Sequence, residues 1–183
     1  MKQALLLLFG ILIISSCSSV KKSQKALNQG NYNEAIGIAV GKLQKDKTKR
    51  GNQEHILILE DAFRKITETN KKRIAFLRKE GNPANFREIY QLYSNLDRIQ
   101  KMISPLLPLY VNDAERHAKF RFTDYSDHLI NSKNEYADYL YEEARSMMEN
   151  GDKLSYRNAF AAFTELQRIY PGFRDTEELL SEA

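Results

Sequence analysis

An unbroken apolar run stands near the beginning of the chain. It covers residues 4–14, follows Lys2 and ends at Ser15-Ser16-Cys17, after which the sequence becomes polar. A helix of this length reaches about 16 Å, whereas the hydrocarbon core of a bilayer is about 30 Å thick. A basic residue, a short apolar run and small residues in this order are typical of a secretory signal. We therefore predict export by a segment that is too short to span the membrane.

Beyond this run, apolar side chains recur at helical spacing. Residues 21–29 form a short polar helix candidate, and Asn31 with Glu34 three positions later is a variant of the capping box that starts a second helix. The apolar positions on one face of this second helix are Ala35, Ile36, Ala39, Val40 and Leu43. Gly30 suits the left-handed residue at a helix C-terminus, so the two helices are predicted to form an antiparallel hairpin.

The same spacing continues over residues 53–79 but is interrupted by a polar stretch from Thr67 to Arg73. This interruption allows either one long helix with a solvated middle or two helices joined by a turn near Asn70. We favour two helices, because a repeat architecture predicts hairpins.

A strong apolar stripe predicts a helix over residues 84–104, which Pro105 ends. In the following segment, residues 109–125, Phe120 and Phe122 alternate with polar side chains, as in a strand. A single isolated strand is rarely stable. The segment is therefore predicted to be an extended connector pinned by its phenylalanines.

Three helices are predicted in the last third of the chain. The first runs over residues 126–150, and the second ends at Pro171-Gly172 after an apolar face. The members of that face are Tyr156, Ala159, Phe160, Phe163, Leu166 and Tyr170. The third starts at Asp175. We expect its Leu179 and Leu180 to be left uncovered at the end of an incomplete array, where they could promote self-association.

The composition of the chain favours helices. Glycine and proline are sparse, and there is no tryptophan. Charge falls along the chain, from +6 over residues 21–50 to −6 over residues 111–183. A basic segment beside a membrane anchor would lie against anionic headgroups. For the basic residues from Lys45 to Arg50, however, we favour the simpler interpretation that they are exposed to solvent. Because the basic residues have little aromatic interleaving, no nucleic-acid partner is predicted.

The residues before and including Cys17 resemble the lipobox of bacterial lipoproteins. The motif is Ile14-Ser15-Ser16-Cys17, and Cys17 is the single cysteine of the chain. The resemblance implies removal of residues 1–16 and lipid on the thiol and the new amine of Cys17. Ser18 follows the cysteine where an Asp would retain the protein in the inner membrane, which implies the outer membrane, facing the periplasm. The alternative is an ordinary secreted protein that is cut nearby.

Two stretches resemble tetratricopeptide repeats. The first matches at Gly30, Tyr32, Ala35, Ala39 and Leu43, and the second at Ala144, Gly151, Tyr156, Ala159, Phe163, Leu166 and Pro171. A three-residue insertion in the turn explains the longer spacing after Gly151. The resemblance implies an all-α fold of antiparallel hairpins stacked in a right-handed array, with Ala35 and Ala159 at close helix contacts. A generic helical bundle with glycine turns is the alternative.

No catalytic set, metal site or cofactor is predicted. The histidines are His55, His117 and His128. The last two, taken with Asp124 and Asp127, match no zinc or calcium spacing, and Asp124 or Ser126 suits a helix cap. Among the tyrosines, Tyr141 is expected in the core, whereas Tyr136 and Tyr139 could line a binding groove.

These observations predict five segments. They are a signal peptide over 1–16, a lipidated Cys17 with a tether over 17–24, helical hairpins over 25–110, a connector over 111–125 and a final hairpin over 126–183. The expected function is that of a lipid-anchored, non-catalytic scaffold of a Gram-negative envelope that binds protein partners. The alternatives are an outer-membrane assembly lipoprotein and a solute- or glycan-binding lipoprotein.

Overall fold

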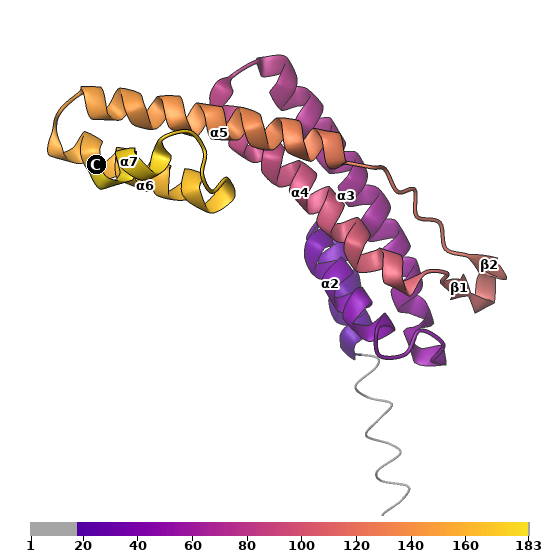
Figure 1. Ribbon diagram of the computed structural model, residues 1–183. Coiled ribbons are helices and arrows are strands. Elements are labelled where there is room, and N and C mark those ends of the chain that lie inside the picture. The colour runs from indigo at the N-terminus through magenta and orange to yellow at the C-terminus, as the bar shows by residue number, and fades with distance from the viewer. Residues whose placement is uncertain (1–17, 183) are drawn as a thin grey trace, which may run out of the picture. The chain divides into compact units, whose positions relative to one another are not determined.

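The computed structural model describes residues 18–182, and they form the predicted all-α fold (Figure 1). Cys17 and Ala183 lie outside the described residues. A helix over residues 18–28 comes first. The elements after it are α2 (Tyr32–Leu43), η1 (Arg50–Asn52), α3 (Gln53–Glu80), η2 (Pro83–Asn85), α4 (Phe86–Ile103), η3 (Ser104–Leu106), β1 (Tyr110–Val111), η4 (Asn112–Ala114), β2 (Arg116–His117), α5 (Ser126–Glu149), α6 (Lys153–Ile169) and α7 (Thr176–Glu182). Within residues 18–182, no helix combines the length and the hydrophobicity that crossing a bilayer requires.

The chain divides into two compact units, each built from two stretches of sequence. Within the described range, unit 1 contains residues 18–72 and 95–123, and unit 2 contains residues 73–94 and 124–182. This division does not follow the boundaries that we expected from the order of the elements. The reason is that α3 and α4 are long, so each helix contributes one end to unit 1 and the other to unit 2.

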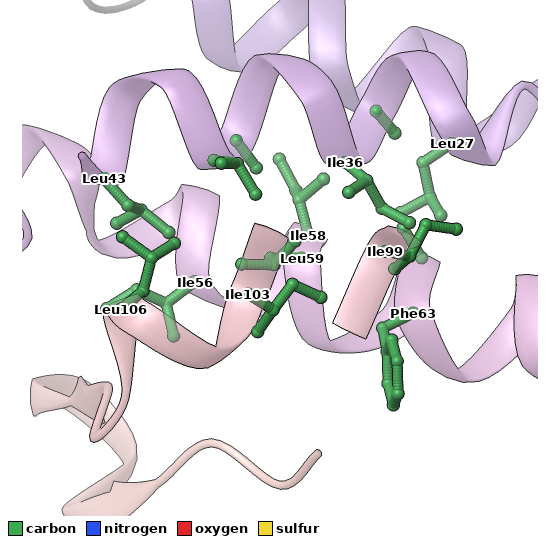
Figure 2. Packing of buried hydrophobic residues seen from close by; sticks show 14 of the residues in the cluster. Leu27, Ile36, Leu43, Ile56, Ile58, Leu59, Phe63, Ile99, Ile103 and Leu106 are labelled. Carbon is green, nitrogen blue, oxygen red and sulfur yellow. The ribbon is translucent and has the colours of Figure 1, made fainter. Parts of the chain in front are cut away.

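The core of unit 1 gathers side chains from the first helix, α2, α3 and the second half of α4 (Figure 2). Ala35 is fully buried in it, at a position where a larger side chain would hold neighbouring helices apart, and Tyr32 packs against its edge. Gly30 has a φ of +79°, the left-handed conformation expected at the end of a helix. The predicted hairpin over the first two helices is therefore confirmed.

The polar stretch in the middle of α3 is helical, and the predicted turn near Asn70 is wrong. The helix runs without interruption over 28 residues. Residues 67–73 contain no Gly or Pro, and lysine, arginine and glutamate are good helix formers. Asn70 itself is buried, while its charged neighbours are exposed to water. The polar stretch therefore corresponds to a part of α3 whose charged side chains are exposed to solvent, and not to the end of a helix.

The residues expected to form a tether belong to the first helix. Residues 18–28 are helical throughout, and Ser23, Ala26 and Leu27 are buried in unit 1. The helix therefore starts earlier than the predicted residue 21, and residues 18–24 form part of a packed element.

The segment after α4 is extended, and its phenylalanines hold it in place as predicted. The rings of Phe120 and Phe122 meet the ring of Phe63 on α3 edge-on, with centroids 5.5 and 5.7 Å away. The short antiparallel pair of β1 and β2 was not predicted; it pairs Tyr110 with His117. Two-residue strands are too short to give a recognisable alternation in sequence.

The core of unit 2 lies mainly between α5 and α6. Ala144, Ala159, Phe163 and Leu166 are fully buried in it or almost so. Gly151 has a φ of +73° in the turn between the two helices, and Asp152 caps α6 by accepting from the backbone N–H groups of Leu154 and Ser155. Tyr156 is half-buried, and Pro171 lies exposed just beyond the helix. Phe160 was assigned to the apolar face, but this is wrong, because 49% of it is exposed.

The last helix does not leave its leucines uncovered. Leu179 and Leu180 of α7 are partly buried and pack against the core of unit 2. The expectation of an exposed apolar end is wrong, because the turn over residues 170–175 brings α7 back onto α6. Self-association through α7 remains a prediction, but exposed leucines at the end of the chain no longer support it.

Candidate functional site

A groove is hollowed into the surface of unit 1. Its volume is about 820 Å³, and it lies between one face of α3 and the extended segment after β2. The α3 side of the lining consists of Leu57, Glu60, Asp61, Phe63, Arg64, Thr67, Glu68 and Lys71, and the other side of Lys119, Arg121 and Thr123.

Helical spacing produces the first wall of this groove. Most of its α3 residues follow one another three or four positions apart, so they share one face of the helix. From Leu57 to Lys71 this face extends about 21 Å, at 1.5 Å per residue. The groove is thus long enough to follow several turns of a bound helix or a short extended peptide.

Hydrogen bonds from α3 and α4 fix the second wall. Glu60 accepts from both terminal nitrogens of Arg116 at 2.8 Å and from the backbone N–H of Lys119 at 2.7 Å. Gln100 accepts from the backbone N–H of Thr123 at 2.6 Å and donates to its carbonyl at 2.8 Å. The extended segment is therefore held at both ends, and the groove is formed before any partner arrives.

Two carboxylates of the groove, Glu60 and Asp61, are paired with basic side chains. The hydrogen bonds from Arg116 lower the pKa of Glu60, so this carboxylate is ionised at neutral pH and cannot serve as a general acid. Asp61 is held by Arg64 at 2.6 Å and by Lys65 at 2.8 Å. Arg121 makes no ion pair within residues 18–182 and is free to meet an acidic group.

Two apolar side chains stand at the surface of this region. Leu57 is 44% exposed and Phe122 is 39% exposed, whereas Phe63 lies buried beneath them. Apolar side chains with a charged surround are the usual anatomy of a protein-binding patch. The arrangement offers contact area and ion pairs, and it contains no nucleophile with an adjacent base.

Tyr136 and Tyr139 do line a second, smaller hollow, in unit 2. Its volume is about 340 Å³, and Arg87, Glu143 and Glu165 share its lining. Tyr136 is buried, and this burial raises the pKa of its hydroxyl, with a further contribution from Glu165. Tyr139 donates its hydroxyl to Glu143 at 2.9 Å. The ring of Tyr136 is buried and that of Tyr139 is partly exposed, whereas Tyr141 lies in the core as expected.

The residues of the rejected metal cluster have other contacts. His128 stacks on Tyr93 at 4.8 Å, and His117 meets Tyr110 edge-on. Asp124 accepts from the backbone N–H of Ser126 at the start of α5. Within the range that the structure describes, no three His, Cys, Asp or Glu residues are placed to hold a metal ion.

His55 is a buried titratable group with a structural role. Its Nε2 lies 3.2 Å from the hydroxyl of Ser19 and its Nδ1 lies 3.3 Å from the hydroxyl of Ser23. Burial lowers the pKa of His55, and the charge of Lys42 lowers it further. His55 therefore joins α3 to the first helix in its neutral form.

We expect the free energy of unfolding to decrease as the pH falls from 7 to 5. The unfolded chain takes up a proton at His55 below about pH 6.5, whereas the folded chain resists protonation until a lower pH. The slope contributed by this residue is at most about 1.4 kcal/mol per pH unit. Urea titrations at several pH values measure it, and ending at pH 5 leaves the carboxylates ionised.

His55→Leu removes the titrating group and should flatten this pH dependence. The control is His117→Gln, which alters an exposed imidazole in the same unit. Equal slopes for wild type and His55→Leu would show that His55 is not the source of the effect.

None of the described residues predicted as site residues lines the groove. Gly30, Tyr32, Ala35, Gly151, Tyr156, Ala159 and Pro171 were assigned to packing, and they lie in the turns, cores and helix ends of the two units. The groove was missed because its two walls are about 60 residues apart in sequence. The alternation of basic and aromatic residues over 119–122 was the one local signal of an accessible extended edge.

Comparison with protein-family models, with curated proteins and with solved structures finds no match. The function is therefore inferred from the residues and their arrangement.

Proposed function

We propose that the protein is a lipid-anchored, non-catalytic scaffold of the bacterial envelope, whose groove in unit 1 binds a segment of another protein. Lipid on Cys17 would hold the chain at the outer membrane, on the periplasmic side. The anchor is supported by the sequence Ile14-Ser15-Ser16-Cys17 after an apolar run that is too short to span a bilayer. We further propose that the two predicted hairpins, at Gly30 and at Gly151, are tetratricopeptide-like units.

One observation carries the binding role. The groove is held open by the hydrogen bonds of Glu60 and Gln100, and it exposes apolar and charged side chains together. A preformed surface costs little ordering when a partner binds. Its α3 side carries both acidic and basic side chains, and its other side is basic at Lys119 and Arg121, which favours a partner that carries both charges in a fixed register.

A protein partner fits this groove better than a small solute does. Sites for small molecules are mostly apolar, with a few convergent polar groups that fix the ligand. Here seven of the eleven lining residues are charged and follow one another along the groove without converging on one point, although much of the surface that they present is the apolar part of their side chains. The solute- or glycan-binding alternative would require several exposed rings, and the hollow beside Tyr136 and Tyr139 offers only the partly exposed ring of Tyr139.

Site-specific photo-crosslinking in the envelope tests the proposal. A photoreactive amino acid at Leu57 or at Thr123 is expected to give discrete adducts with another protein, because both positions are exposed and line the groove. The control position is Ile130 in unit 2, which is 58% exposed and lies on α5. The adduct bands are identified by mass spectrometry.

A second variant links the adducts to the charge of the groove. Arg121→Glu reverses the sign of one side chain that has no ion pair within the described residues, and it should weaken the adducts formed at Leu57. Adducts of equal yield at Ile130 and Leu57, or none at either groove position, would contradict the proposed binding role without bearing on the lipid anchor.

A further inference from the structure

One end of unit 1 combines the start of the first helix with a strongly basic loop. Figure 1 shows the start of this helix and the loop between α2 and α3 at the same end of unit 1. Hydrogen bonds establish the same proximity. Ser19 bonds to His55 in the first turn of α3, and Asn52, just before α3, donates to the carbonyl of Asp46 in the loop at 2.6 Å.

The loop presents its basic side chains to solvent. Lys45, Lys49 and Arg50 are exposed and make no ion pair within residues 18–182. The one carboxylate of the loop, Asp46, accepts hydrogen bonds from the backbone of Thr48 and Lys49 and from the Thr48 hydroxyl. Asp46 therefore shapes the turn, and its charge offsets that of Lys49 only in part, since no ion pair joins the two side chains.

The loop is also fixed in position. Lys47 donates to the carbonyl of Leu106 at 3.0 Å, and Asn52 ties the loop to the end of α2 through the carbonyl of Lys42. The exposed cations are thus displayed on a defined turn of unit 1. A mobile basic tail would lack this fixed orientation.

The first helix adds positive charge and leaves no spacer. Lys21, Lys22 and Lys25 are exposed on it, and Lys22 lies 3.4 Å from Glu34. Residues 18–54 together hold eight basic and three acidic side chains. Because Cys17 directly precedes the packed helix, an acyl chain on Cys17 would bring this end of unit 1 to the level of the headgroups.

We propose that this basic end of unit 1, defined by Lys21, Lys45, Lys49 and Arg50, binds the phosphate groups of anionic lipids and serves as a second membrane contact beside the acyl chains. The inference rests on the proposed lipid anchor at Cys17. Cations are attracted to an anionic surface when they lie within about a Debye length of it, roughly 8–10 Å. Because no spacer separates Cys17 from the packed helix, the anchor would hold the basic end of unit 1 close to the headgroups. The acidic Glu54, Asp113 and Glu115 lie near this end as well, through the bond from Asn112 to Gln53, and they limit the attraction without reversing it.

Vesicle co-sedimentation of an unlipidated chain isolates this contact from the anchor. The chain covers residues 17–183 with Cys17→Ser, and it keeps both hydrophobic cores because all their described members lie within residues 18–182. It is expected to sediment with phosphatidylglycerol-containing vesicles at low salt and to remain in solution with pure phosphatidylcholine vesicles.

Charge removal at the basic end should abolish this binding. Lys45→Gln, Lys49→Gln and Arg50→Gln together are expected to lower the partition coefficient about 100-fold, at about fivefold per charge. The matched control is Lys72→Gln, Lys79→Gln and Lys153→Gln, which removes the same charge from exposed positions elsewhere. Circular dichroism confirms that both variants keep their helix content.

Three results would overturn the inference. They are absence of binding to phosphatidylglycerol, equal binding to both kinds of vesicle, and equal losses in the two triple variants. Membrane fractionation of the full chain tests the lipid anchor separately, so failure of the anchor and failure of the headgroup contact can be told apart.

Discussion

Replacing Cys17 with serine is expected to abolish stable membrane attachment of the protein. The hydroxyl of serine cannot take the thioether-linked diacylglyceryl group that the lipobox resemblance implies. Each buried CH₂ group contributes about 0.8 kcal/mol, so two or three acyl chains hold a protein stably where one chain holds it marginally. Membrane fractionation followed by an alkaline wash measures the change, because the wash strips proteins that are held by charge alone.

Ser18→Ala is the matched control, since it alters the neighbouring residue and keeps the cysteine. It should remain in the washed membrane together with the wild-type protein. Retention of Cys17→Ser after the wash, at the level of the wild type, would refute the anchor.

Replacing Phe163 with alanine is expected to destabilise unit 2 by about 3–5 kcal/mol. The side chain is fully buried between α5 and α6, and its ring meets the ring of Tyr141 edge-on at 6.2 Å. The substitution removes this apolar contact and leaves a cavity that the surrounding helices can close only in part. Urea denaturation followed by circular dichroism measures the loss.

Phe160→Ala provides the control on the same helix. Phe160 is one turn away and 49% exposed, so its removal should change the free energy of unfolding by about 0.5 kcal/mol or less. Equal losses for the two variants would mean that α6 does not bury the face seen in the structure.

Most helices of this protein can be predicted because their apolar spacing is local information. The stripe over residues 84–104 and the glycines at 30 and 151 mark helices and turns through neighbouring residues alone. The residues around Asn70 show where apolar spacing alone does not locate a helix end. A polar stretch can interrupt an apolar stripe because the backbone turns, or because one continuous helix changes its packing partner. The two cases look alike in the apolar spacing, but residues 67–73 lack the Gly or Pro that would have marked a turn.

The parts that could not be predicted depend on distant partners. Ser23 is polar and looked like part of a tether, yet it is buried because His55, 32 residues later, lies within hydrogen-bond distance. The groove likewise exists because Glu60 holds the backbone of Lys119. No local pattern contains such pairings, so the sequence could indicate a binding protein but could not show where it binds.

Intact-mass analysis of the protein extracted from the envelope would show whether the mature chain begins at a lipidated cysteine. We predict a chain that lacks residues 1–16 and carries a diacylglyceryl group and an amide-linked acyl chain on Cys17, with the lipid located on the N-terminal peptide after proteolysis. A mature chain with a free Cys17 thiol, or one that begins elsewhere and carries no lipid, would contradict this prediction.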